Sequence, residues 1–333
     1  MGLPRYAVLL PLAWCLQLGH AIRAHNPNPT KFLLISAPRT GHVSYTRIQK
    51  MSSKRGPTST QVLINEGLVH PQGLAVDQKR RKLLVADPDS KRIFSYSLQS
   101  SPNGLVVGPQ SVCAEGIEAR WVTIDSTGNI FFSDEPRNQI MKITSAKALR
   151  GDSTPEVVYD GALLSQVSAP GGIATDNFHT YWVNKQIGSQ VGSLVQASAD
   201  VRHASAVRPL ARNTDKSYGV CLALGNVFFT QPDTTISGVK KDGSSVVTVS
   251  NHLTKPRGCV WDGDGTVYVA DRGANAVYSF AANMPELGFA QVSKAVDFQD
   301  AFGVAVFSGS LEGRPATATW LGATLLTLLA AAA

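Results

Sequence analysis

The chain of 333 residues lacks the short motifs of several common sites. Its four cysteines form no Cys-x-x-Cys or Cys-x-x-His pair, which argues against the usual structural zinc sites. It has no Gly-x-Ser-x-Gly elbow and no Gly-x-x-x-x-Gly-Lys-Ser/Thr loop, so the nucleophile elbow of the α/β-hydrolases and a phosphate-binding P-loop are excluded. No apolar run reaches the roughly 20 residues that a membrane-spanning helix needs.

Charge is also scarce, at 17% of residues, whereas apolar residues make up 43%. A chain of this composition buries a core, so wholesale disorder is excluded. Turn formers are abundant, with 29 glycines and 18 prolines. This composition favours many short strands joined by turns over a bundle of long helices.

The N-terminus, residues 1–21, is typical of a secretory signal. Arg5 supplies a positive charge, an apolar run of 13 residues follows at 6–18, and Ala21 ends a small-residue cleavage pattern. Cleavage after Ala24 fits as well. An uncleaved anchor or a buried strand is the alternative. We therefore expect a secreted chain.

The C-terminus, residues 308–333, has the order of a lipid-attachment signal. Small residues at 308–310 precede a mostly polar spacer at 311–319, and a 14-residue tail at 320–333 is apolar apart from threonine. Small site, spacer and apolar tail are the parts of a GPI signal. The pattern predicts a protein anchored at the outer surface of the cell; a short membrane tail or an unstructured Ala-rich end are the alternatives.

Removal of both ends leaves a mildly basic chain, because the net charge falls from +7 only to about +6. The basic residues are spread along it, so we expect no nucleic acid among its partners. The mature chain keeps Cys113, Cys221 and Cys259, an odd number for an oxidising compartment. Cys221 and Cys259 occupy related points of neighbouring repeats, which leaves open whether they pair or are simply small buried residues.

An internal repeat fills the middle of the chain. Pro-Gln-Gly-Leu-Ala-Val-Asp at 71–77 is followed by Lys-Leu-Leu-Val-Ala-Asp at 82–87 and by a third β-rich run. The same order returns at 121–143, 170–184, 218–230 and 256–280. Asp77 and Asp262 are 185 residues apart, about 46 residues for each of four steps. A period of this length with short strands predicts propeller blades, and a mature chain of about 288 residues holds six.

Both ends of the mature chain contribute to one blade in this interpretation. The segment 301–307 looks like an innermost strand with nothing after it, whereas 31–36, 42–48 and 61–65 look like three strands that lack their first. Joining them closes the ring and removes free sheet edges. We therefore expect an all-β, six-bladed β-propeller over residues 22–307. The copy around Leu224, which lacks the first Asp, is its weakest blade.

These residues resemble the six-bladed propellers of the NHL-repeat and LDL-receptor class B (YWTD) group. The run at 71–77 is similar to the NHL form, and Thr-Tyr-Trp-Val-Asn at 180–184 is similar to the Tyr-Trp-Thr-Asp form. The resemblance spans residues 31–307 and implies a fold rather than a function, because such propellers include receptors, scaffolds, RNA binders and enzymes.

Polar residues close the second strand of several repeats, with arginines nearby. A ring of carboxylates and guanidinium groups at one end of the channel would grip a polar ligand. The candidate ligand-binding residues are Arg39, Asp87, Asp134, Arg137, Asn184, Asp271 and Arg272. The alternative is structural, because an Asp at a strand end often accepts hydrogen bonds from the next backbone amides.

The resemblance also leaves an enzyme open. Related calcium-dependent lactonases use a central Glu, Asn and Asp, and NHL-type amidating lyases use histidines on zinc. Here the closing blade begins with Phe302-Gly303-Val304, without a Glu, and only His70 and His252 precede a Pro-x-Gly loop. We therefore expect no cofactor and a recognition module for a protein, peptide or glycan. A calcium- or zinc-dependent hydrolase or lyase is the alternative.

Overall fold

The computed structural model describes residues 29–48, 59–186, 194–200, 207–212, 216–232 and 234–309. The predicted signal at 1–21 and the predicted tail beyond residue 309 lie outside this part of the chain. Within it, nearly all regular structure is β-strand, and the helices are the short α1 (Ser145–Leu149) and a single turn at Pro38–Thr40. None of the described helices is long and apolar enough to cross a membrane.

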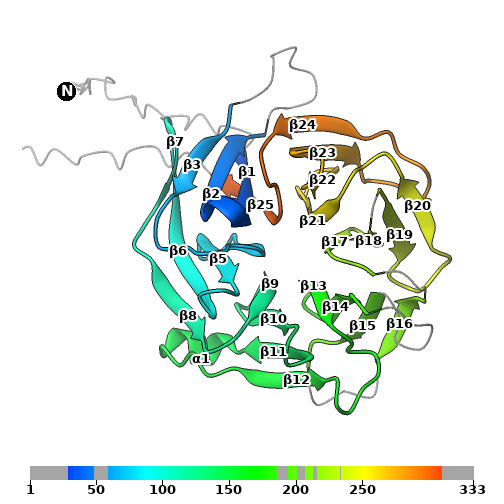
Figure 1. Ribbon diagram of the computed structural model, residues 1–333, viewed down its shortest axis with the longest axis horizontal. Coiled ribbons are helices and arrows are strands. Elements are labelled where there is room, and N and C mark those ends of the chain that lie inside the picture. The colour runs from blue at the N-terminus through cyan, green and yellow to red at the C-terminus, as the bar shows by residue number, and fades with distance from the viewer. Residues whose placement is uncertain are drawn as a thin grey trace, which may run out of the picture.

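Six antiparallel sheets stand around one axis, each with its first strand innermost, so the chain is a six-bladed β-propeller (Figure 1). Blade I is β4 (Leu74–Asp77), β5 (Lys82–Asp87), β6 (Arg92–Ser101) and β8 (Ser111–Glu115). Blade II is β9 (Ala119–Ile124), β10 (Ile130–Asp134), β11 (Gln139–Ile143) and β12 (Glu156–Asp160). Blade III is β13 (Pro170–Thr175), β14 (His179–Asn184), β15 (Leu194–Ser198) and β16 (Arg208–Ala211).

Blades IV to VI complete the ring. Blade IV, the copy with the weakest repeat, is β17 (Val220–Ala223), β18 (Asn226–Thr230), β19 (Ile236–Lys240) and β20 (Val247–Ser250). Blade V is β21 (Pro256–Trp261), β22 (Thr266–Asp271), β23 (Ala276–Ala281) and β24 (Ser293–Asp297). Blade VI is β25 (Val304–Gly309), β1 (Thr30–Ala37), β2 (His42–Arg47) and β3 (Gln61–Ile64).

The predicted seam is confirmed, because β25 from the end of the chain pairs with β1 from its start. Phe32 lies opposite Phe307 and Thr30 opposite Gly309 in this antiparallel pair, and Figure 1 shows the two strands side by side. The strand β25 continues to Gly309 and so includes two residues of the small-residue run. Ring closure therefore buries the edges that both terminal segments would otherwise expose.

Blade I carries one hairpin that the repeat pattern does not predict. The strand β6 continues to Ser101, turns through Pro102 and Asn103, and returns as β7 (Gly104–Val107) before β8 pairs with its first half. The hairpin reaches the outer side of blade VI, where the Arg47 guanidinium donates a hydrogen bond to the Pro102 carbonyl oxygen. Pro, Asn and Gly in succession are the turn signal in this segment.

Glycines let the blades meet closely around the axis. Five of the six innermost strands have, near their start, a glycine whose missing side chain faces the backbone of the next blade. These are Gly73, Gly172, Gly219, Gly258 and Gly303. A Cβ on Gly73 would lie 2.7 Å from the Trp121 Cα, and one on Gly258 would lie 2.8 Å from the Phe302 carbonyl oxygen. The glycine of the Pro-x-Gly repeat is thus required by close approach between blades.

Hydrogen bonds join these same glycines to the neighbouring blade. The amides of Gly73, Gly172 and Gly258 donate to the carbonyl oxygens of Arg120, Tyr218 and Phe302, at 2.9, 2.7 and 2.9 Å. These bonds link blade I to II, III to IV, and V to VI.

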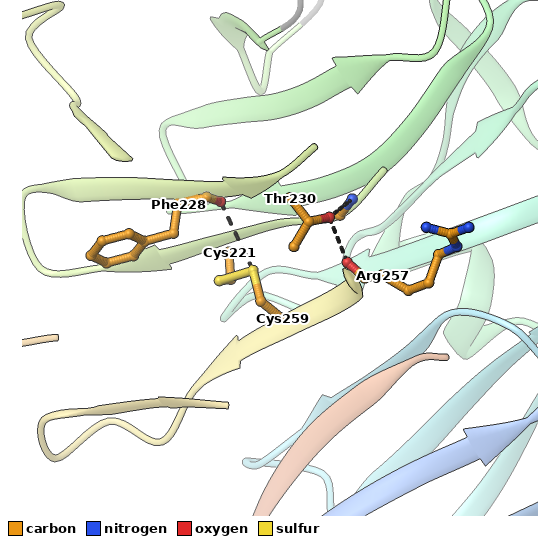
Figure 2. Close-up of a disulfide and its surroundings, with 6 residues drawn as sticks. Cys221, Phe228, Thr230, Arg257 and Cys259 are labelled. Atoms are coloured by element: carbon orange, nitrogen blue, oxygen red, sulfur yellow. Dashed lines mark hydrogen bonds between the residues drawn. A yellow bond between two sulfur atoms is a disulfide. The ribbon is translucent and has the colours of Figure 1, made fainter. Parts of the chain in front are cut away.

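A buried hydroxyl completes the link at two further boundaries. The Gly219 amide donates to Thr230 Oγ1, which donates to the Arg257 carbonyl oxygen at 2.7 Å (Figure 2). The Gly303 amide and the Gln72 carbonyl oxygen are bridged in the same way by Ser36 Oγ. The boundary between blades II and III differs, because Trp121 stands in the glycine position. There the equivalent hydroxyl, on Ser133, is buried without a partner among the described residues.

A disulfide adds a covalent link between blades IV and V. Cys221 on β17 and Cys259 on β21 are bonded, with their Cα atoms 5.6 Å apart (Figure 2). The sequence left this pairing open. Cys113 on β8 is the one free cysteine among the described residues, and burial raises the pKa of its thiol to about 11. A thiol with that pKa stays protonated, and therefore unreactive, at neutral pH.

The glycine contacts predict a large cost for adding one methyl group at the seam. We expect Gly303→Ala to lower the free energy of unfolding by about 3 kcal/mol, because its Cβ would overlap the Gln72 carbonyl oxygen. Gly225→Ala is the matched control, since a Cβ there meets no atom within 4 Å. Urea unfolding followed by tryptophan fluorescence measures both; equal midpoints for the two variants would contradict the account.

Candidate functional site

In each blade, one residue directly precedes the glycine position of the innermost strand (Trp121 in blade II). The six residues of this kind form a ring at one end of the channel. We call this end the channel mouth. Its six ring residues, in blade order from I to VI, are Gln72, Arg120, Gly171, Tyr218, Arg257 and Phe302. They comprise one amide, two arginines, one glycine and two aromatic residues, so the repeat holds the backbone constant and varies the side chain here. Ligand specificity in a propeller can reside at such positions.

A second set of mouth residues follows the second strand of each blade. Antiparallel pairing puts the end of that strand beside the start of the first, as in the pairs of Pro170 with Asn184 and of Pro256 with Asp271. Three of the residues that come next are charged: Glu135, Lys185 and Arg272. The Lys185 chain lies against Gly171, where a Cβ would be 3.4 Å from its Cε. Glycine in the ring therefore leaves room for this lysine.

An aromatic pair closes the channel beneath the mouth. The rings of Trp121 on blade II and Phe302 on blade VI stack with centroids 5.3 Å apart, and both side chains are buried. The Trp121 ring also reaches Gly258 on blade V, so it crosses the axis. Trp121 Nε1 and Gln72 Oε1 are buried without hydrogen-bond partners among the described residues.

Beyond this aromatic pair the channel widens into a cavity of about 330 Å³. Its side chains are almost all apolar and come from the innermost strands of all six blades, with Val76, Ile124, Leu222 and Val306 among them. No charged side chain is among those that line this cavity, so the charged groups near the axis are those at the mouth. The concave, charged surface is the candidate for ligand binding.

Glu135 holds two cations at the mouth. Its Oε2 atom lies 2.6 Å from Arg120 Nε and 2.5 Å from Lys185 Nζ. Burial lowers the pKa of Lys185, and the Glu135 carboxylate opposes that shift, while the charges of Arg120 and Arg257 add to it. The cations of blades II, III and V are thus close enough to act on one another.

Arg257 has no carboxylate of its own. Its guanidinium lies 4.1 Å from the centroid of the Tyr218 ring, and Nη1 donates to the Pro256 carbonyl oxygen at 2.8 Å. None of the ion pairs in the described structure includes it. Burial lowers its pKa, and the charge of Arg272 contributes in the same direction. Arg257 is therefore a partly buried cation that lies against the face of the Tyr218 side-chain ring.

Near blades V and VI, Asp300 pairs with two arginines, much as Glu135 pairs with two cations near blades II and III. Arg272 Nε donates to Asp300 Oδ1 at 2.6 Å, and its guanidinium lies over the Phe302 ring, 5.6 Å from the centroid. Arg39 approaches the same carboxylate at 3.7 Å from an exposed position. Arg39 and Arg272, both predicted site residues, are thus brought together through an Asp that the sequence did not single out.

Next to the Glu135 group lies a hollow of about 520 Å³. It is lined by Glu135, Ala169, Lys185, Gln186, Lys216 and Tyr218. Two ammonium groups and one carboxylate face this space beside an aromatic ring. Its volume suits a side chain or a short segment of a larger ligand.

The predicted Asp and Asn residues lie at this same end but inside the protein. Asp87, Asp134, Asn184 and Asp271 have at most 1% of their surface exposed. Asp271 accepts four backbone amides, from Thr254, Lys255, Gly273 and Ala274. Asp87 accepts those of Val69, His70 and Ser90. Each of these carboxylates thus bonds both to the loop that leads into its blade and to the turn after its own strand. This is the structural role that an Asp at a strand end often has.

Asn184 does the same with an amide: Oδ1 accepts from the Ser168 amide and Nδ2 donates to the Gln166 carbonyl oxygen. Asp134 accepts from the Arg137 amide, and Arg137 Nη2 reaches the Gly116 carbonyl oxygen in blade I. A role for these residues in ligand binding stays a prediction, whereas their structural contacts are visible.

The sequence reasoning missed Arg120, Glu135, Lys185, Tyr218, Arg257 and Asp300. The sequence repeat does mark the positions of five of them. Arg120, Tyr218 and Arg257 fill the variable position of Pro-x-Gly, and Glu135 and Lys185 come directly after the polar residue that closes the second strand. The predicted ring concentrated on the polar residue that closes the strand, whose side chain turns inward in the structure.

For metal chemistry, the described residues contain no group of three His, Cys, Asp or Glu side chains arranged to hold an ion. His70 Nδ1 lies 3.7 Å from an Asp89 carboxylate oxygen, and the His252 ring contacts the Phe289 ring. The two histidines thus have separate surroundings.

No protein-family model matches the chain, and no curated protein matches it. Solved structures do match. A chain in a nidogen–laminin complex shares 15% identity with a TM-score of 0.64, over 84% of this chain and all of that one. A putative 6-phosphogluconolactonase of Bacteroides fragilis shares 11% identity with a TM-score of 0.57, covering 84% and 99%. A gluconolactonase of Xanthomonas campestris shares 13% with a TM-score of 0.57, covering 83% and 94%. At these identities the likeness shows the six-bladed fold alone.

Proposed function

We propose that this protein is an exported recognition module that binds a protein ligand at the channel mouth. The observation that carries the proposal is the partly buried cluster of Arg120, Lys185, Arg257 and Arg272 above a channel closed by Trp121 and Phe302. A closed channel with its charge on the outer surface suits contact with a macromolecule that stays outside. Partly desolvated arginines beside aromatic rings are typical of the residues that dominate protein interfaces.

The fold holds these side chains in place before a ligand arrives. The backbone carbonyl oxygens of Arg120 and Arg257 each accept a hydrogen bond from the previous blade. Their backbone is therefore fixed from two sides. A preorganised surface loses less entropy on binding, which favours affinity. A chain of similar fold occurs in a nidogen–laminin complex, and that occurrence supports a protein as the ligand.

The proposed location is the outer cell surface, with a lipid anchor following Gly309. The Cys221–Cys259 disulfide supports export, since disulfides persist in oxidising compartments. The strand β25 runs from Val304, two residues after Phe302 at the mouth, to Gly309 at the opposite end of the channel, beside Thr30. An anchor attached there leaves the mouth directed away from the membrane, and Thr30, where β1 begins, lies at the membrane end.

Site-specific photocrosslinking tests where the ligand binds. We place p-benzoylphenylalanine at Gln186, which is exposed and lines the hollow, and in a second protein at Phe178, which is 78% exposed in the turn at the far end. The Phe178 replacement is the matched control because it exchanges one aromatic side chain for another. Displayed on the cells that make it, the protein should form discrete protein adducts from Gln186 only. A chelator should leave these adducts unchanged.

Adducts from Phe178 alone, or equal adducts from both positions, would contradict binding at the mouth. Loss of the Gln186 adducts on chelation would instead favour the metal-dependent alternative.

The anchor has its own test. Phosphatidylinositol-specific phospholipase C, added to intact cells, should release the protein into the medium with a mass that ends near residue 309. Retention of the protein on the cells after this treatment would contradict the lipid anchor while leaving the mouth proposal standing.

A further inference from the structure

The geometry points to a carboxylate as the group that the channel mouth recognises. We propose that Arg257, with Lys185 beside it, binds an Asp or Glu side chain or the C-terminal carboxylate of a partner protein. This inference rests on the proposed function, because it names the chemistry of the ligand at that same mouth.

Charge at the mouth is unbalanced in favour of cations. Arg120 and Lys185 share Glu135, and Arg272 is paired with Asp300. These two carboxylates therefore serve three cations, and Arg257 adds a fourth with no ion-pair partner in the described structure. Among these ion-paired groups and Arg257, cations outnumber carboxylates by two. The charge of buried Asp271, which is occupied by four backbone amides, also acts on Arg257, and exposed Arg39 and Lys216 add further positive charge. An anion that binds here gains from several partly buried cations at once.

Arg257 is also held in a geometry that suits a flat anion. Its guanidinium lies against the Tyr218 ring, and one of its donors is used on the Pro256 carbonyl oxygen. The remaining N–H groups are free of protein partners among the described residues. A guanidinium whose plane is fixed offers paired donors that match the two oxygens of a carboxylate. The side chain is thus preorganised for bidentate contact.

The same observations favour a carboxylate on a protein over a sulfated glycan. Polyanionic glycans are best met by rows of exposed cations, whereas the cations here are partly buried and interleaved with Glu135 and Asp300. The adjoining hollow of about 520 Å³ accepts one short segment, and its Tyr218 ring offers apolar contact to the carbon chain beside a carboxylate. One acidic residue fits this arrangement better than a chain of sulfates.

The experiment uses a capped hexaglutamate peptide as the probe and a capped hexaglutamine peptide as its uncharged match, with the full-length protein. Binding is followed by isothermal titration calorimetry. We expect saturable, salt-sensitive binding of hexaglutamate alone. Arg257→Gln should weaken it about tenfold or more, because a charge-assisted pair is lost. Arg257→Lys, which keeps the charge but not the planar fork, should give an intermediate loss.

Arg92→Gln is the matched control. Arg92 is an exposed arginine on the outer strands of blade I, where it pairs with Glu115. Arg92→Gln removes the same single charge without touching the cluster of cations at the mouth. We expect it to change hexaglutamate affinity less than twofold. Equal losses in the Arg92 and Arg257 variants, or no saturable binding at about 10 mM peptide, would overturn the inference. Tighter binding of heparin than of hexaglutamate, lost in Arg257→Gln, would overturn it in favour of a glycan.

Failure of this inference can be told from failure of the proposed function. Arg257→Gln is also combined with the photocrosslinker at Gln186. Adducts that form normally in this double variant would leave the mouth as the binding surface and overturn the carboxylate assignment alone. Absence of adducts in both the parent and the double variant would overturn the proposed function itself.

Discussion

The structure depends on close backbone contact between neighbouring blades around the axis. Wherever a glycine begins the innermost strand, its amide reaches the next blade, either directly, as Gly73 reaches Arg120, or through a buried hydroxyl such as Thr230. Each bond is modest by itself, worth about 1 kcal/mol. Its larger effect is geometric, because a side chain at these positions would push the blades apart. The glycines therefore set the radius of the ring.

The candidate site follows from the same contacts. A residue whose carbonyl oxygen accepts a bond from the previous blade has a fixed backbone beside the channel axis. Arg257 is fixed in this way through Thr230, and Arg120 through Gly73. Variation at these positions changes the chemistry of the mouth without changing the fold. At the single departure, Trp121 stands where the other blades have a glycine, so the glycine hydrogen bond is replaced between blades II and III, and the Trp121 ring closes the channel with Phe302.

Much of the fold could be predicted from the sequence, because the repeat encodes it directly. The period of about 46 residues and the incomplete segments at both ends led to six blades and to the pairing of β25 with β1. The site was harder to predict, since it depends on which way a side chain turns at the end of a strand. Asp271 and its neighbour Arg272 are adjacent in sequence, yet the first is buried among backbone amides and the second lies at the mouth. The β6–β7 hairpin and the Cys221–Cys259 bond depend on contacts between segments distant in sequence, which a single repeat does not encode.

Hydrogen exchange of the glycine amides tests the central claim most directly. Gly73, Gly172 and Gly258 each donate to the next blade and lie in different blades. If the inner contacts form one cooperative ring, these three amides exchange only through global unfolding and share one free energy of opening. That free energy should fall equally for all three as urea is added. Exchange of any one of them at the rate of an exposed loop would contradict a continuous ring.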